Sequence, residues 1–122
     1  MPYQIEDKGS YLLISLSGRF DSHDLVLLLA DVARIEESSI SPPHRIITFP
    51  GITDFVAQHE ELRSITFRRS NHLLPFDIKA GIVTTSPIEQ GMARMWQSLI
   101  ANPRITVRIF SSIEAAEAWI SE

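Results

Sequence analysis

The sequence predicts an α/β fold in which helices cover a mixed, largely parallel sheet. Short apolar runs typical of strands alternate with longer segments whose apolar residues recur at helical spacing. A turn at residues 7–10 joins the first two strands so closely that they are expected to pair antiparallel. Helix-length segments separate the later strands and favour right-handed crossovers between parallel neighbours. The expected order is β-β-α-β-α-β-α-β-α, in a single domain spanning residues 1–122.

The expected strands are apolar runs bounded by turn residues. Gly9 lies in the first turn, where a positive φ costs glycine little, and Gly18 ends the second strand. Pro50 and Gly51 stop the third strand. The five predicted strands cover residues 3–6, 11–16, 45–49, 78–84 and 105–110.

Capping residues predict the starts of the first two helices. Asp21 or Ser22 can accept hydrogen bonds from the first free amides of a helix that runs to the loop at 38–43. Thr53 or Asp54 can do the same for a second helix, which ends near Asn71. The first helix has a clear apolar stripe of Leu25, Leu28, Leu29, Val32 and Ile35.

Two further helices follow in the second half of the chain. Ser86, Pro87 and Glu89 form a capping box with proline at the first helical position. Ser111 and Glu114 indicate another capping box. Within the third helix, Gly91 is expected to allow close helix packing. The expected apolar stripes are Ile88, Met92, Met95, Trp96 and Leu99 in the third helix and Ile113, Ala116, Trp119 and Ile120 in the last.

Composition excludes several functional classes. Without cysteine there is no disulfide framework, thiolate metal site or cysteine nucleophile. A net charge of −4 argues against a nucleic-acid partner. The longest near-continuous apolar stretch, residues 25–30, is far shorter than the ~20 residues of a membrane span. Residues 1–10 lack the apolar stretch of a signal peptide, so a cytoplasmic location is expected.

Three parts of the chain resemble the STAS superfamily, and in particular the SpoIIAA-like domains related to bacterial anti-sigma factor antagonists. They are the opening hairpin with residues 18–21 after it, the strand at 45–49 running into residues 51–55, and the ending at 107–120. The resemblance implies a SpoIIAA-like fold. It also implies a non-enzymatic module that binds protein partners, nucleotides or, in some branches, apolar ligands.

The resemblance also raises the question of a phosphorylation switch. In anti-sigma factor antagonists the second helix opens on an Asp-Ser-Ser-Gly motif whose serine a partner kinase phosphorylates. Aligned on this chain, the motif falls near Val56, Ala57 and Gln58, where no hydroxyl stands. Thr53 lies before that position and is more simply interpreted as a helix cap. We therefore expect the module to lack the phosphoserine switch.

Catalytic and metal-binding motifs are incomplete. His59 and Glu60 suggest a zinc-peptidase helix, but that motif needs a second histidine at position 63, which is arginine. His23 follows a serine and precedes Asp24, yet side chains of sequence neighbours on a helix diverge. No Gly-x-Ser-x-Gly or phosphate-cradling glycine motif occurs. We expect no catalytic residues, no metal and no cofactor.

The second predicted helix is the candidate partner-binding surface. Phe67 points away from the inferred apolar stripe, towards His59 and Arg63, on a segment that is basic within an acidic chain. Aromatic and arginine side chains commonly anchor protein interfaces. Packing of Phe67 under the loop at 73–76 is the alternative. The expected partner-binding residues are Thr53, Asp54, His59, Arg63 and Phe67.

Three functions follow from these features. The preferred one is a non-catalytic regulatory or interaction module with an unidentified protein partner. The second is a carrier or sensor of a lipid or small apolar ligand, with its pocket lined by the first and third helices. Val26 and Leu27 lie off the main stripe of the first helix, and this apolar surplus suits a ligand pocket and a homodimer face equally. The third is an enzyme using His59 and Glu60.

Overall fold

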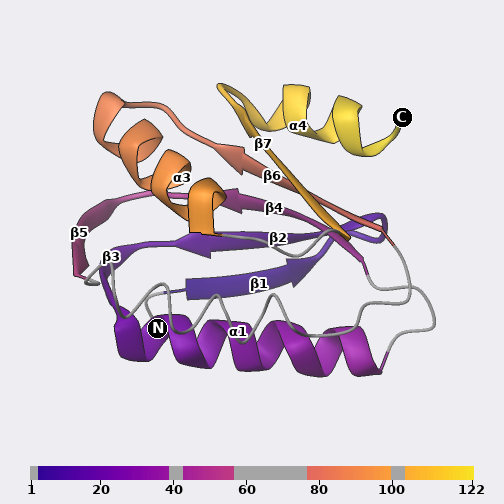
Figure 1. Cartoon of the computed structure of the whole chain (residues 1–122), viewed down its shortest axis with the longest axis horizontal. Coiled ribbons are helices and arrows are strands. Elements are labelled where there is room, and N and C mark those ends of the chain that lie inside the picture. The colour runs from indigo at the N-terminus through magenta and orange to yellow at the C-terminus, as the bar shows by residue number, and fades with distance from the viewer. Residues whose placement is uncertain (1–2, 39–42, 57–76, 100–103) are drawn as a thin grey trace.

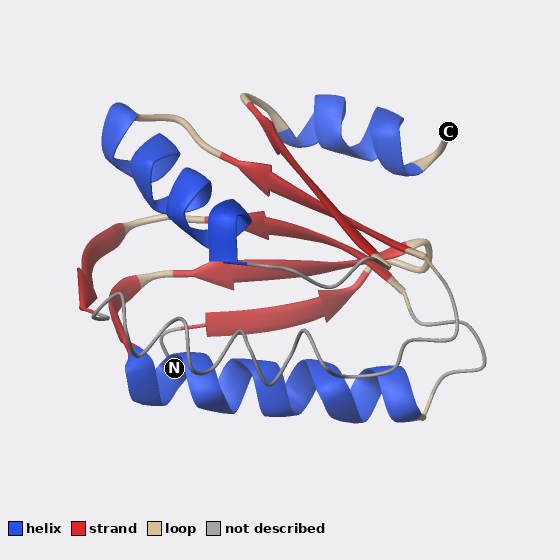
Figure 2. Cartoon of the chain, viewed as in Figure 1, coloured by secondary structure: helices blue, strands red, loops and turns tan. Residues whose placement is uncertain are grey.

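The computed structural model describes residues 3–38, 43–56, 77–99 and 104–122 of the chain. In the described part, a helix follows β3, β6 and β7, and the other strands follow one another along the chain (Figures 1 and 2). The strands are β1 (Tyr3–Asp7), β2 (Tyr11–Leu16), β3 (Gly18–Asp21), β4 (His44–Thr48), β5 (Ile52–Val56), β6 (Ile78–Val83) and β7 (Ile105–Phe110). The helices are α1 (Ser22–Glu37), α3 (Pro87–Leu99) and α4 (Ile113–Ile120).

Five strands form the main sheet, in the order β1-β2-β4-β6-β7. The β1–β2 pair is antiparallel and the other three pairs are parallel, as the sequence predicts for a hairpin followed by crossovers. The amide of Lys8 donates to the carbonyl of Tyr11 (2.9 Å) and closes the hairpin turn. Gly9 sits in that turn at φ 91°, a conformation that L side chains rarely adopt.

The two faces of the sheet carry separate apolar cores, because side chains alternate between faces along every strand. On one face, Ile14, Ile47 and Ile82 pack in one cluster with residues of α1 and α3. On the other face, Ile46 and Val83 pack with α4. The helical members of the first cluster include Leu25, Leu28 and Val32 of α1 and Met92 and Ala93 of α3, while those of the second are Ile113, Ala116, Trp119 and Ile120.

The second predicted helix does not begin where the sequence suggested. Thr53 and Asp54 lie in β5, which pairs in parallel with β3 in a second, two-stranded sheet. Both were expected to cap a helix, and that prediction is wrong. The segment Ile52–Val56 is rich in β-branched and aromatic residues, which favour strands, and β3 supplies the neighbouring backbone for its hydrogen bonds.

The other helix starts agree more closely with the sequence. Asp21 caps α1: it accepts from the amide of Asp24 (3.0 Å), whose carboxylate accepts from the amide of Asp21 (3.1 Å). The hydrogen bond from the amide of Asp24, more than any other interaction, lowers the pKa of Asp21. Ser86 accepts from the amide of Glu89 as predicted (3.2 Å). The cap of α4 is Ser112 and not Ser111, because the amide of Ala115 donates to the Ser112 hydroxyl.

Two expectations for α3 fail. Ile88 was placed on the apolar stripe, but its side chain is 78% exposed in the first turn. Gly91 was expected to allow close helix packing. It is exposed, and a Cβ built on it would meet no heavy atom of the described residues within 4 Å.

Replacing Gly91 with alanine is therefore expected to stabilise the protein. Alanine in an exposed helix interior is favoured over glycine by about 1 kcal/mol, since it restricts the unfolded chain more. Urea denaturation followed by circular dichroism measures the change. A lower denaturation midpoint for Gly91→Ala would contradict the open surroundings of this position.

Candidate functional site

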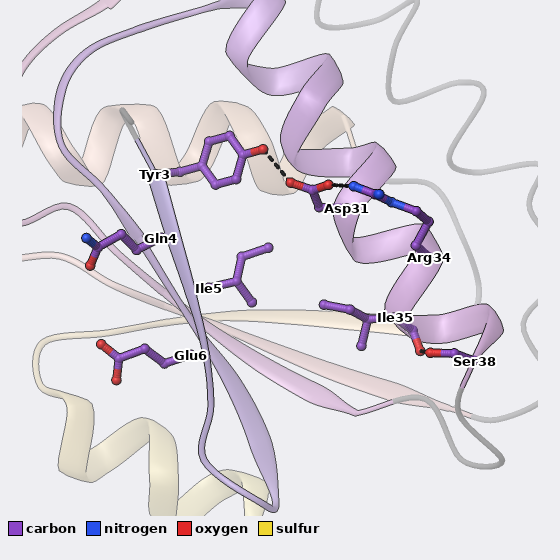
Figure 3. Close-up of a pocket in the computed structure, with 8 residues that line it drawn as sticks. All are labelled: Tyr3, Gln4, Ile5, Glu6, Asp31, Arg34, Ile35 and Ser38. Carbon is purple, nitrogen blue, oxygen red and sulfur yellow. Dashed lines mark hydrogen bonds and ion pairs between the residues drawn. The ribbon is translucent and has the colours of Figure 1, made fainter.

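An open groove of about 640 Å³ lies between edge strand β1 and the C-terminal half of α1. Figure 3 shows the residues that line it, with Ile5 and Ile35 extending into the space between the two elements. We call it the β1–α1 groove. Its lining residues are Tyr3, Gln4, Ile5 and Glu6 from β1 and Asp31, Arg34, Ile35 and Ser38 from α1.

A chain of polar side chains closes one end of the groove. The hydroxyl of Tyr3 donates to Asp31, which also forms an ion pair with Arg34 one turn further along α1 (Figure 3). The ring of Tyr3 is buried in the core, whereas the side chain of Arg34 is 75% exposed. Asp31 is thus fixed between the Tyr3 hydroxyl and the Arg34 guanidinium. The guanidinium lies at the mouth of the groove.

The groove follows the edge of β1 and not one face of it. Tyr3 and Ile5 belong to the face that packs towards α1, while Gln4 and Glu6 point to the opposite face, and all four line the groove. A space on one face of the sheet would border only every second side chain of β1. A space that borders all four must run along the edge of the strand. Within the described ranges β2 is the sole partner of β1, so β1 is an edge strand there.

Only two of the five sequence-predicted site residues, Thr53 and Asp54, lie in the described part of the chain. Thr53 is exposed on β5, and the backbone of Asp54 is in register with that of Arg19 on β3. His59, Glu60, Arg63 and Phe67 fall in 57–76, outside the described residues, as do Ala57 and Gln58 of the expected phosphorylation motif. Neither Thr53 nor Asp54 lines the β1–α1 groove, and the role of all five candidates in partner binding stays a prediction.

His44 is the described histidine with the most defined surroundings. Its Nδ1 accepts from the backbone amide of Lys79 on the neighbouring strand (2.9 Å), so the ring is neutral with its proton on Nε2. Partial burial lowers the pKa of His44 below its ordinary 6.5, and the charges of Lys79 and Arg45 lower it further. The side chain therefore acts as a structural acceptor between β4 and β6.

Stability is expected to fall as the pH drops from 6.5 towards the lowered pKa of His44. In that window the unfolded chain binds a proton that the folded chain does not, so this contribution is present above pH 6.5 and lost below the folded pKa. The loss is at most about 1.4 kcal/mol per pH unit. Chemical denaturation at several pH values measures it. His44→Asn keeps an acceptor and does not titrate, so an unchanged pH dependence in that variant would contradict the assignment.

The face beneath α4 is held by aromatic and cationic side chains. Arg108 lies 5.4 Å from the ring centroid of Trp119, and Lys79 lies at the same distance from it. The ammonium of Lys79 donates to the carbonyl of Trp119 at the end of α4. Burial and a hydrogen bond to Glu117 raise the pKa of Tyr11. These groups hold α4 on the sheet, and Trp119 is a core residue as predicted.

The described residues form neither a metal cluster nor a membrane-spanning helix. In that part of the chain, no three side chains of histidine, aspartate or glutamate gather closely enough to hold a metal ion. The helices it contains are too short or too polar to cross a bilayer.

Sequence reasoning missed the β1–α1 groove because its two walls are 28 residues apart between Tyr3 and Asp31. In the sequence, one wall is simply a short strand and the other is the end of an amphipathic helix, and neither pattern indicates a binding site. The predicted ligand pocket between the first and third helices is a different place from the β1–α1 groove and stays a prediction. The surplus apolar residues of α1 are exposed, as their place off the stripe suggested, with Val26 at 49% and Leu27 at 41%.

Comparison with known proteins supports the fold alone. No protein-family model matches the chain, and no curated protein matches it. One similar solved structure is an uncharacterised protein of the DUF3478 family, with a SpoIIAA-like fold, from Shewanella loihica PV-4. Its sequence is 15% identical, the match covers 97% of this chain and 91% of that one, and the TM-score is 0.54. The chain therefore has a SpoIIAA-like fold, as its opening hairpin and closing helix indicated.

Proposed function

We propose that this protein is a non-catalytic interaction module of regulatory type that binds a protein partner through the β1–α1 groove. The observation that carries the proposal is an open groove beside an edge strand, with aliphatic walls and fixed polar groups at one end. The SpoIIAA-like fold is compatible with this role but does not select it, because a fold hosts many functions.

The lining gives the groove both affinity and selectivity. Ile5 and Ile35 are half-buried and offer apolar area that a partner side chain would remove from water. Arg34 and Asp31 hold a fixed pair of charges at the mouth, and exposed Glu6, ion-paired with Lys8 (2.9 Å), adds a second pair at the other border. Such fixed charges select among partners more than they add to affinity.

Charging the groove wall is expected to abolish partner capture. Ile35→Glu places a carboxylate among the apolar contacts, whereas Leu27→Glu changes an equally aliphatic, exposed residue of the same helix that does not line the groove. Proteins captured from a lysate of the source organism are compared by mass spectrometry. A partner retained by Leu27→Glu and lost by Ile35→Glu is the expected result, with affinity at least about tenfold weaker.

The second proposed surface is Thr53, Asp54, His59, Arg63 and Phe67. The same capture experiment on Phe67→Asp and Arg63→Glu separates it from the groove. Loss of the partner in these variants, together with retention in Ile35→Glu, would move the binding site to that surface and refute the groove. A partner that all four variants retain would refute both surfaces.

A second candidate function is favoured by the size of the groove. About 640 Å³ lies within the roughly 300–1,000 Å³ range of small-molecule sites, so a lipid or small apolar ligand would fit. Native mass spectrometry of the purified protein, with solvent extraction, tests this role. A clean mass of the chain alone would exclude a carrier that retains its ligand. An enzyme using His59 and Glu60 remains a third, separate hypothesis.

A further inference from the structure

We propose that the β1–α1 groove takes an extended segment of another protein, which pairs with β1 and adds a strand to the main sheet. This inference rests on the proposed function and specifies how the partner binds. It follows from the direction of the β1 backbone, the open edge, the position of α1 and the chemistry of the walls.

The hairpin turn fixes which backbone groups of β1 point outwards. Lys8 is hydrogen-bonded to Tyr11, and pairs alternate between bonded and non-bonded along an antiparallel ladder. The amides and carbonyls of Gln4 and Glu6 therefore point towards β2. Those of Tyr3, Ile5 and Asp7 point away from β2, into the space beside the strand. A row of donors and acceptors is thus ready for another strand.

The opposite edge of the sheet is partly covered by a side chain. On β7 the outward carbonyl of Val107 accepts from the side-chain amide of Gln97 on α3 (2.9 Å). Exposed Arg104 and Arg108 flank it, and charged edges discourage strand pairing. In the described part of the chain no such side chain bonds to the outward groups of β1. The two edges are therefore built differently, and β1 is the one suited to pairing.

The position of α1 excludes a second copy of β1 as the occupant. Two copies paired antiparallel through β1 would place both α1 helices on the same face of a continuous sheet. In Figure 1, α1 runs beside β1 and beyond the edge of the sheet. Paired strands are about 4.8 Å apart and packed helices need about 8–10 Å, so the two helices would collide. A lone extended segment from a partner brings no second α1 helix to that face.

The walls define the chemistry of the segment. A residue opposite Ile5 points to the same face as Ile5, towards Ile35, and would be apolar (Figure 3). Its neighbours in the segment point to the face of Gln4 and Glu6, where the Glu6 carboxylate already pairs with Lys8, and would be polar. The occupant is thus an extended peptide that alternates aliphatic residues with polar ones over at least the five residues of β1.

Hydrogen exchange at single amides tests the inference directly. The probes are peptides enriched on the purified protein from a displayed random library of segments about ten residues long. In the free protein, the amides of Tyr3, Ile5 and Asp7 should exchange rapidly, and those of Gln4 and Glu6 slowly. At saturating peptide, the exchange of Ile5 should slow at least about tenfold, which is the factor that 1.4 kcal/mol of protection gives. Peptides that alternate as described are expected among those enriched.

Ile35→Glu and Leu27→Glu serve as the matched pair for the enriched peptides. The first should weaken binding at least about tenfold and the second should leave it unchanged. Sedimentation of the free protein accompanies the measurement. Slow exchange of the Ile5 amide in the free chain would overturn the inference, since the edge of β1 would then already be paired. A dimer that forms with rising concentration would in that case identify a second copy of the chain as the partner of β1.

The remaining outcomes separate this inference from the proposed function. Peptides whose binding depends on Ile35 but leaves the exchange of Ile5 unchanged would overturn strand addition and keep the groove as a binding site. A library that yields no peptide dependent on Ile35 would overturn strand addition. A natural partner that is captured and lost with Ile35→Glu would then still support the proposed function. If Ile35→Glu weakens the binding of neither the enriched peptides nor a captured partner, both strand addition and the proposed function are refuted.

Discussion

Replacing Arg45 with methionine is expected to lower the free energy of unfolding by about 3–5 kcal/mol, because it removes the guanidinium that faces the buried carboxylate of Glu36. Both terminal nitrogens of Arg45 lie 3.3 Å from Oε1 of Glu36. The side chains are only 7% and 2% exposed, which makes this the most deeply buried ion pair between described residues. It joins the end of α1 to the start of β4.

The double variant Glu36→Leu, Arg45→Met provides the control for this prediction. It removes both charges and is expected to be more stable than Arg45→Met alone, since the buried carboxylate is removed together with its guanidinium partner. Guanidinium denaturation of the wild type and of the single and double variants measures the coupling. A single variant that loses less than about 1 kcal/mol would show that the pair is effectively solvated.

Gly81→Val is expected to lower the free energy of unfolding by about 1–3 kcal/mol through overpacking beneath α4. A Cβ at this position of β6 would lie 3.2 Å from the Cβ of Ala116 and 3.5 Å from the ring of Phe110. Both neighbours belong to the core cluster under α4, and Ala116 is fully buried. The added methyl groups of valine would push α4 away from the sheet.

The contrast with Gly91 makes the Gly81 prediction specific. Gly81→Ala should destabilise less than Gly81→Val, and Gly91→Ala should stabilise, although the chemical change is the same at both glycines. Thermal unfolding by calorimetry orders the three variants. A stability of Gly81→Val equal to the wild type would mean that α4 does not pack this closely on β6.

Sequence patterns predicted the main sheet well where one local signal decided the structure. The strands at 11–16 and 105–110 have the bounds expected, because each is an apolar run between turn residues. Asp21, one of the two predicted caps, caps α1, and Ala116, Trp119 and Ile120 of the α4 stripe are buried as predicted. In these places propensity, capping and burial all favour the same conformation.

Prediction failed where two local signals competed. Thr53 and Asp54 are good helix caps, but they lie within a segment of strand-forming residues, and pairing with β3 decided the outcome. Ser111 and Ser112 are neighbouring caps, and only the backbone path after β7 selects Ser112. Ile88 fits the helical period of α3, yet it falls in the first turn, beyond the edge of the core.

The candidate site could not be predicted because it has no local pattern. The β1–α1 groove depends on how far α1 lies from β1, which is a property of the packed core. The bond between Tyr3 and Asp31 joins two residues with no spacing relation in the sequence. The outward direction of the Ile5 amide and carbonyl depends on the register of the β1–β2 pair. A slip of one residue in that register would turn these groups towards β2.

The opening hairpin also bears on how the chain folds. Of the pairings between described strands, β1–β2 is local and needs only a tight turn, whereas each parallel pairing must first close a long loop. Hairpins form in roughly 1–10 μs, and sheets with distant contacts assemble far more slowly. The strand that offers its edge in the native protein is thus expected to be among the first structures that the chain acquires.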